Sequence, residues 1–153
     1  MKTKKRQIII VLTGIIFCAY IFLLVTISKN QNPYCVIISS DKTQYEVVKS
    51  QIKEVEYNIP VYIKNKANRE LSSIKNFYLS YHLYDEKKKL IQFDNVRTEI
   101  PAVFSTDKKL VDLKVEVPLK KGHYFLEPDI VNEGVTWFSE QGNKNEMIEF
   151  VIK

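Results

Sequence analysis

The sequence predicts an all-β protein, an antiparallel β-sandwich preceded by one N-terminal transmembrane helix. Two observations carry this prediction. Residues 8–27 contain no charged side chain and directly follow a basic tail. Most of the remaining chain alternates apolar with polar residues at a period of two, which is typical of strands with one buried face. The chain has 153 residues, so the part after the apolar segment is long enough for one domain.

The apolar segment has the length of a bilayer crossing. As a helix with a rise of about 1.5 Å per residue, residues 8–27 would extend about 30 Å, which matches the hydrocarbon core of a membrane. The tail at residues 1–7 contains four basic residues and no acidic one, and the positive-inside rule places such a tail in the cytoplasm. We therefore expect a single-pass plasma-membrane protein with an extracytoplasmic C-terminal domain.

Two other kinds of N-terminal signal are alternatives. A cleaved secretory signal has an apolar stretch of about 7–15 residues and a small-x-small cleavage site, and the closest match here is Thr26-Ile27-Ser28. A lipoprotein signal would use Cys18, but the bulky Phe17 precedes that cysteine. The longer, branched apolar stretch favours an uncleaved anchor.

The charge distribution argues against a nucleic-acid partner. The formal net charge is +5, yet four of the 23 basic residues lie in the tail, and all 18 acidic residues lie beyond residue 27. The outer part therefore carries 19 basic and 18 acidic residues. A nucleic-acid-binding face requires clustered positive charge, whereas Lys87–Lys89 and Lys120–Lys121 fall in predicted turns. The high isoelectric point reflects membrane topology.

The extracytoplasmic domain is expected at residues 34–153, after a short polar tether at 28–33. Its first clear strand runs from Val55 to Ile63, where alternate residues are apolar, and Pro60 within it indicates a bulge or a sheet edge. A second strand covers 77–84 and places Ser80 and His82 on a polar outer face. Further strands are predicted at residues 90–93, 113–117, 123–130 and 147–152. Six or seven strands with turns every 8–12 residues are typical of a β-sandwich.

Two residues of this domain have a predicted structural role. Cys35 is the only cysteine beyond the apolar segment, so the domain has no internal disulfide and must be stabilised by its core. Its apolar neighbours favour burial, with a bond to another chain as the alternative. Tyr124 follows Gly122-His123 at the entry to a late strand, the place where sandwiches often have a tyrosine corner.

Three segments, residues 79–85, 93–101 and 129–138, carry a resemblance to a known family. Their order and spacing, and mainly the motif Glu-Gly-Val-x-Trp-Phe at 133–138, resemble an immunoglobulin-like module of bacterial proteins in surface-polysaccharide metabolism. In those proteins the module often accompanies glycosyltransferase or methyltransferase domains. The resemblance implies an immunoglobulin-like sandwich and an association with envelope glycans. The present chain departs from that family because it has no catalytic domain and carries its own anchor.

Motifs for catalysis and metal binding are absent from the sequence. His82 and His123 are the only histidines, whereas a zinc site takes three or four protein ligands. No nucleophile elbow marks a serine triad, and the four glycines build no phosphate-binding loop. We therefore expect no metal, no cofactor and no enzymatic activity. A hydrolase would be considered only if the fold prediction were wrong.

The candidate binding residues gather near two loops. Asp94 and Arg97 lie in one segment, and Asp129 and Glu133 lie around a later strand end and its loop. Arg97 with a carboxylate could form a bidentate ion pair that holds the two loops in register. Trp137 could be a structural core residue or, if exposed, a flat platform for a sugar. If the protein contacts a glycan, we expect Trp137, Tyr84, Asp94 and Arg97 to do so.

Taken together, the sequence predicts a membrane-anchored, extracytoplasmic binding or scaffolding module of a bacterial cell-surface glycan pathway. Its partners would be the membrane, through residues 8–27, and either a surface polysaccharide or the proteins that assemble it. The alternative is a structural interaction subunit that docks into a larger envelope complex through a strand edge or its membrane helix, with no glycan contact.

Overall fold

The computed structural model describes residues 13–24, 32–47, 56–116 and 120–153. The chain divides into two compact units between Asn32 and Pro33.

The described part of the first unit is a helix at residues 13–24. Across the described ranges, no helix combines the length and the apolar character that a membrane crossing needs. The predicted span at 8–27 also includes residues 8–12 and 25–27, which lie outside the described residues, as do residues 28–31 of the predicted tether.

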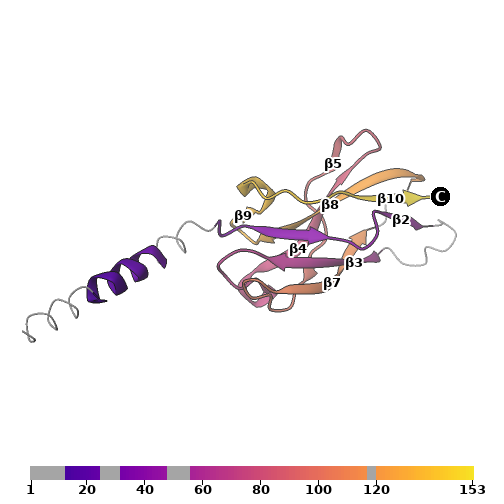
Figure 1. The fold of residues 1–153 in the computed structure, drawn as a ribbon. Coiled ribbons are helices and arrows are strands. Elements are labelled where there is room, and N and C mark those ends of the chain that lie inside the picture. The colour runs from indigo at the N-terminus through magenta and orange to yellow at the C-terminus, as the bar shows by residue number, and fades with distance from the viewer. Residues whose placement is uncertain (1–12, 25–31, 48–55, 117–119) are drawn as a thin grey trace, which may run out of the picture. The chain divides into compact units, whose positions relative to one another are not determined.

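The second unit is a sandwich of two β-sheets (Figure 1), which confirms the predicted all-β class. One sheet has the strand order β1-β3-β7, with β1 at Val36–Ser39, β3 at Glu56–Asn65 and β7 at Lys108–Glu116. The other has the order β2-β10-β8-β4-β5, with β2 at Gln44–Val47, β10 at Ile148–Ile152, β8 at Gly122–Asn132, β4 at Phe77–Tyr84 and β5 at Leu90–Gln92. The short strands β6 (Thr98–Glu99) and β9 (Thr136–Trp137) pair with β4 and β8, and two 3-10 turns, η2 (Ser73–Lys75) and η3 (Ser139–Gln141), complete the domain.

The core lies between the two sheets and is built from the apolar positions that the period of two identified. In β3, Ile59, Val61 and Ile63 are fully buried. They belong to the same core cluster as apolar residues of the facing sheet, namely Leu79, Tyr81, Leu83, Leu126, Ile130 and Phe150. The strands predicted around 55–63 and 77–84 are therefore confirmed, and burial of their apolar faces supplies the main driving force for folding.

The N-terminal strands differ from the prediction. Strands β1 and β2 contain four residues each, too few for a clear alternation, and they were not expected. β1 pairs antiparallel with β3, whereas β2 pairs parallel with β10 in the opposite sheet. The chain therefore changes sheets near Ser40, whose hydroxyl lies 2.8 Å from the Tyr45 hydroxyl. The sandwich is mixed at this edge and not purely antiparallel.

Pro60 lies on the central strand of its sheet, at a position that pairs with β7 but not with β1. Pairing of β1 with β3 ends at Ser39 opposite Tyr62, so Pro60 lies just past that ladder. Its carbonyl oxygen accepts a hydrogen bond from the Ser40 hydroxyl on the β1 side. The amide nitrogen of a strand residue points to the same side as its carbonyl, so the missing N–H of proline costs no ladder hydrogen bond. β3 is the central strand of its sheet, so the predicted sheet edge is wrong, and pairing with β7 continues through Asp112 without the alternative, a bulge.

Tyr124 forms the predicted corner at the start of β8. Its hydroxyl donates to the carbonyl oxygen of Lys120 at 3.2 Å, four residues upstream, and its ring packs against the core. Gly122, at φ +157°, lies under this ring: a Cβ there would meet the ring at 3.5 Å. Cys35 is a free thiol and is half-buried.

The second unit is expected to fold without the first. A protein lacking residues 1–28 should be soluble, monomeric and β-rich, because the whole buried core belongs to residues 33–153. Circular dichroism and sedimentation would check this. A strongly helical spectrum, or a chain that remains unfolded, would contradict it.

Candidate binding site

The outer face of β4 is covered by a loop. Ser80 and His82 are buried, so the prediction that they form a solvent-facing polar surface is wrong. The segment 92–97, between β5 and β6, folds back over them: the Ser80 hydroxyl donates to the Asn95 carbonyl at 3.2 Å, and His82 Nδ1 meets the Phe93 carbonyl. Strand periodicity assigns side chains to two faces but does not reveal that a later segment covers one of them.

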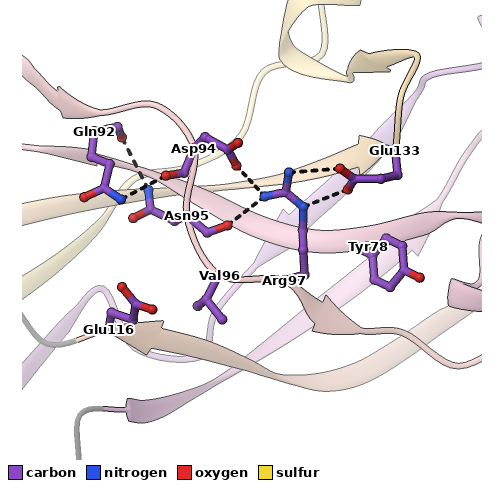
Figure 2. Close-up of a pocket in the computed structure, with 8 residues that line it drawn as sticks. All are labelled: Tyr78, Gln92, Asp94, Asn95, Val96, Arg97, Glu116 and Glu133. Carbon is purple, nitrogen blue, oxygen red and sulfur yellow. Dashed lines mark hydrogen bonds and ion pairs between the residues drawn. The ribbon is translucent and has the colours of Figure 1, made fainter.

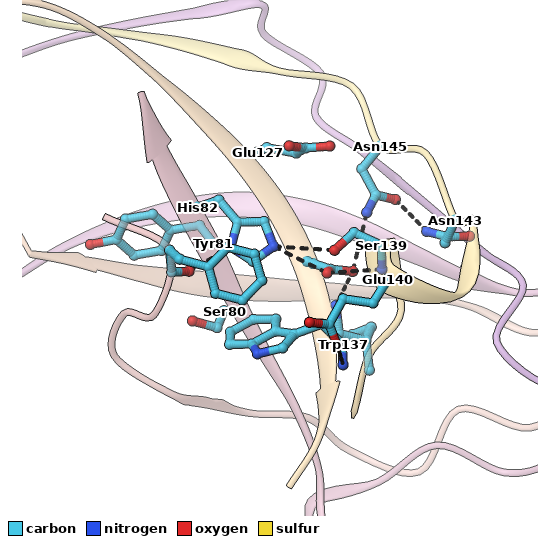
Figure 3. A network of polar contacts seen from close by, with 12 residues as sticks. Ser80, Tyr81, His82, Glu127, Trp137, Ser139, Glu140, Asn143 and Asn145 are labelled. Carbon is cyan, nitrogen blue, oxygen red and sulfur yellow. Dashed lines mark hydrogen bonds and ion pairs between the residues drawn. The ribbon is translucent and has the colours of Figure 1, made fainter. Parts of the chain in front are cut away.

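Beneath this loop, His82 forms a buried ion pair with Asp129 of β8. Nε2 of His82 lies 3.2 Å from Oδ2 of Asp129, and both residues are at most 1% exposed. Figure 3 shows His82 beside Ser139 and Trp137. Asp129 also accepts hydrogen bonds from the amide of Ser139 at 3.1 Å and from the side chain of Asn145 at 3.4 Å. A buried carboxylate needs such donors, so this pair fixes the η3 turn as well as the loop above it.

The surroundings of His82 favour its charged form. Burial lowers the pKa of His82, but hydrogen bonds to Asp129 and to the Phe93 carbonyl, and the charges of Asp129 and Glu127, outweigh burial and raise it above its ordinary value. A carbonyl oxygen can only accept, so Nδ1 carries a proton, and Nε2 faces a carboxylate. The raised pKa of His82 thus favours an imidazolium opposite Asp129.

This cluster does not have the geometry of a serine triad. The Ser139 hydroxyl is 3.4 Å from Nε2 of His82, the same nitrogen that faces Asp129. A triad histidine holds its carboxylate on one nitrogen and keeps the other free to accept the serine proton, whereas here the second nitrogen is occupied by the Phe93 carbonyl. Among the described residues, no group of three or more His, Cys, Asp or Glu side chains could hold a metal ion.

Trp137 is part of the same buried layer. It is 9% exposed, and its ring lies 4.7 Å from that of His82 and 5.3 Å from that of Phe93, measured between centroids. The guanidinium of Arg97 covers it at 5.0 Å. Of the two roles that the sequence left open, the structural one fits this burial, because a sugar platform needs an exposed ring face.

Arg97 joins the two loops as the sequence predicted. Its Nε donates to Oε2 of Glu133 at 2.8 Å and its Nη2 to Oε1 at 3.4 Å, while its Nη1 donates to Asp94 and to the Asn95 carbonyl (Figure 2). Partial burial lowers the pKa of Arg97, but the hydrogen bonds to Glu133 and Asp94 raise it above its ordinary value overall. The bidentate contact holds the guanidinium in one orientation.

An open groove of about 700 Å³ lies beside this ion pair. It is lined by three carboxylates, two amides, one guanidinium, one tyrosine and one valine (Figure 2), which are Asp94, Glu116, Glu133, Gln92, Asn95, Arg97, Tyr78 and Val96. A second hollow of about 440 Å³ shares Tyr78 and Arg97 with it. Ligand sites combine apolar side chains with a few fixed polar groups, and here Tyr78 and Val96 supply the apolar part.

The groove bridges the two sheets, and two hydrogen bonds hold that junction. The amide of Glu116 in β7 donates to the Tyr81 hydroxyl at 3.0 Å, and the amide of Lys114 donates to the Thr98 hydroxyl at 2.9 Å. Burial raises the pKa of Tyr81 to about 12, which keeps its hydroxyl neutral. The bond to Tyr81 fixes the backbone of Glu116, a lining residue of the groove, against β4.

The four residues predicted to contact a ligand do not all line this groove. Asp94 and Arg97 do, whereas Trp137 lies under Arg97 and is not among the lining residues. Tyr84 does not line it either, since its hydroxyl donates to Glu127 of β8 at 2.6 Å. Burial, together with this hydrogen bond and the nearby carboxylates, raises the pKa of Tyr84.

Sequence reasoning did not identify several of the lining residues. Tyr78 was placed on the outer face of its strand, which is correct, but not in a site. Glu116 comes from β7 in the other sheet, and only tertiary packing brings it near the 92–97 segment. No signal in the sequence indicates that proximity.

No protein-family model and no curated protein matches the chain. Among solved structures, the chain is similar to the CARDB domain of the PF1109 protein from Pyrococcus furiosus, crystallised in complex with di-metal ions. That likeness has a TM-score of 0.44 and 14% sequence identity, and covers 76% of this chain and 89% of the other. At these values it assigns neither a family nor a ligand to this chain.

Replacing Trp137 should act on stability. Trp137→Ala is expected to lower the free energy of unfolding by about 3–5 kcal/mol, because it removes a buried ring from the layer with His82 and Phe93. Urea unfolding of the protein lacking residues 1–28 measures this. Trp137→Phe keeps an aromatic ring and should cost less. Equal stability of the alanine variant and the unaltered protein would contradict the structural role.

The charged pair of His82 should make stability depend on pH. The folded-state pKa of His82 is raised, so its contribution is fully present below the unfolded value of about 6.5 and is lost as the pH rises through the folded value. The stability difference between the unaltered protein and His82→Gln should therefore shrink as the pH rises above about 6.5. His123→Gln, at the exposed histidine, is the control. A difference that stays constant with pH would argue against an imidazolium at this position.

Proposed function

We propose that this protein is a membrane-anchored, extracytoplasmic module with an immunoglobulin-like fold, and that it binds or scaffolds a component of a bacterial cell-surface glycan pathway. It acts without catalysis. The observation that supports binding most directly is the open polar groove beside the Arg97–Glu133 ion pair.

Topology supports the immunoglobulin-like assignment. The central pair of the larger sheet is β4 and β8, flanked by β10, and the smaller sheet has β3 at its centre. Tyr124 forms its corner at the start of β8, which is the place of the tyrosine corner in immunoglobulin-like sandwiches. The strand order places one N-terminal strand in each sheet.

Anchoring is supported by the sequence. The uncharged run at 8–27 and the basic tail before it predict a helix across the plasma membrane with the tail in the cytoplasm. Residues 13–24 within this run are helical. The sandwich would then lie outside the cell, where a glycan ligand is accessible.

The groove offers the chemistry that a polyhydroxylated ligand requires. Carboxylates and amide oxygens accept hydrogen bonds from hydroxyl groups, and the ring of Tyr78 offers an apolar face to C–H groups. The ion pairs hold Arg97 in place before any ligand arrives, and such preorganisation lowers the entropy cost of binding. Two sources of hydroxyl-rich ligand fit this chemistry, a finished surface polysaccharide and its lipid-linked precursor.

Tyr78 is the residue whose replacement tests this proposal. On an array of bacterial surface glycans, Tyr78→Ala should weaken binding by about tenfold, which corresponds to ~1.4 kcal/mol, because it removes the aromatic ring from the groove. The matched control is Tyr62→Ala on β3 of the other sheet. Like Tyr78, Tyr62 is half-buried, but it does not line the groove.

Equal effects of the two variants, or the absence of any glycan bound by the unaltered protein at millimolar concentrations, would contradict glycan binding in the groove. Retention of full affinity by Tyr78→Ala together with its loss in Tyr62→Ala would move the site to the other sheet.

The alternative is an interaction subunit without glycan contact, and one observation favours it. Strand β5 forms an edge of the larger sheet and exposes Leu90 and Ile91, at 44% and 53%. An edge strand with exposed apolar residues can accept a strand from a partner protein. Loss of an envelope complex in Ile91→Lys, with Tyr78→Ala unaffected, would favour this alternative.

A further inference from the structure

One end of the sandwich exposes apolar side chains on three separate loops. Ile74 is 96% exposed, Phe104 56% and Val135 67%. Ile74 lies in η2 between β3 and β4, Phe104 lies between β6 and β7, and Val135 lies between β8 and β9. Because these side chains are so exposed, they add little to the core, and the stability of the fold does not explain why apolar residues occupy these positions.

Backbone hydrogen bonds hold these loops together at the same end. The amide of Ser73 donates to the carbonyl of Ile100 at 3.2 Å, which joins the first loop to the second. The amide of Glu133 donates to the carbonyl of Asn76 at 2.9 Å, which joins the first loop to the third. A bridge between Leu71 and Val103 adds a further link. The three apolar residues are therefore carried by a rigid, connected set of loops.

The chain enters the domain at this same end. Strand β1 begins at Val36, which pairs with Asn65, the last residue of β3. The amide of Lys66, at the start of the first loop, donates to the carbonyl of Cys35 at 3.0 Å. Six tether residues, 28–33, can span about 20 Å at most when fully extended. A bilayer that holds residues 8–27 would thus lie close to these loops.

We propose that Ile74, Phe104 and Val135 form a lipid-contact surface that inserts shallowly into the outer leaflet of the membrane. This rests on the proposed anchoring through residues 8–27. The surface would fix the tilt of the sandwich on the bilayer, so that the domain stands on its membrane-proximal end instead of rotating freely about the tether.

The arrangement fits a bilayer better than a protein partner. Each apolar side chain stands alone among polar neighbours at a loop tip, such as Lys75 and Asn76 beside Ile74 and Ser105 beside Phe104. A stable protein interface buries about 800 Å² per partner around a contiguous apolar centre. Isolated apolar residues next to Lys and polar groups suit the membrane interface, where apolar side chains reach the acyl boundary and polar groups stay hydrated.

Lipid contact can be measured residue by residue in the full-length protein. The two native cysteines are first removed by Cys18→Ala and Cys35→Ala. A single new cysteine is then introduced in each of four variants and labelled with an environment-sensitive fluorophore. These substitutions are Ile74→Cys, Phe104→Cys, Lys87→Cys and Ile16→Cys. The proteins are reconstituted in vesicles of phosphatidylcholine and phosphatidylglycerol that contain a lipid-attached quencher. Lys87 is the matched control because it lies in the β4–β5 turn, at the other end of β4 from Phe77 and the three loops.

We expect probes at positions 74 and 104 to be quenched several-fold more than the probe at 87, with the probe at 16 quenched as a membrane-embedded reference. Strong quenching at 16 with equal, weak quenching at 74, 104 and 87 would overturn the lipid-contact surface and leave the anchor standing. Weak quenching at 16 would overturn the proposed anchoring itself.

A third outcome would also overturn the inference. In this outcome the probes at 74 and 104 are shielded from a water-soluble quencher but are not quenched by the lipid-attached one. If this shielding also increases with the protein density in the vesicles, a second copy of the protein covers the surface instead of lipid. Circular dichroism of each labelled variant verifies that its sandwich is folded.

Discussion

The buried ion pair between His82 and Asp129 determines how the rest of the candidate site is arranged. Burying two charges is unfavourable unless each has its partners. Here His82 and Asp129 lie on neighbouring strands of one sheet, and their further partners are the Phe93 carbonyl and the Ser139 amide. The segment 92–97 and the η3 turn therefore have to lie where they do. Arg97 and Trp137 take their positions from these two elements.

The residues of this buried layer contribute to stability, whereas the residues that line the groove are available to a ligand. The Trp137 ring and the His82 pair lie under the loop, and the ring of Phe93, which belongs to the loop and is partly exposed, stacks on His82. Arg97 touches both this layer and the groove. Its guanidinium is held by Glu133 and Asp94, so little of its charge is left for a ligand. Nδ2 of Asn95 already donates to the carbonyls of Tyr81 and Gln92, and Nε2 of Gln92 donates to the carbonyl of Asp94. The open hydrogen-bonding capacity of the groove thus rests mainly on the remaining lone pairs of its carboxylates, which can accept hydrogen bonds from the hydroxyl groups of a neutral molecule.

The sequence was informative where local periodicity decides the structure. The strands β3 and β4 were predicted because each presents a long alternation of apolar residues, and β8 because a turn precedes it. Tyr124 was predicted because its spacing from Gly122 is a local signal. The sequence also indicated that Arg97 could pair with a carboxylate and hold two loops in register, but it did not identify Glu133 as that carboxylate. The sequence was less informative for β1 and β2, which are too short to show a period. It also did not reveal the burial of His82, because that burial depends on a loop that begins ten residues later. The place of Glu116 in the groove depends on packing between sheets, and alternation along one strand cannot reveal it.

The parallel pairing of β2 with β10 has a mechanical consequence. The two strands run side by side over Gln44–Val47 and Glu149–Ile152, so a pull that draws the N-terminal and C-terminal ends apart would slide one strand along the other. In this shear geometry the ladder hydrogen bonds share the force and must rupture together, instead of opening one by one as in a zipper. A domain tethered at one terminus and gripped at the other would for this reason resist extension, a useful property for a module exposed to flow or turgor.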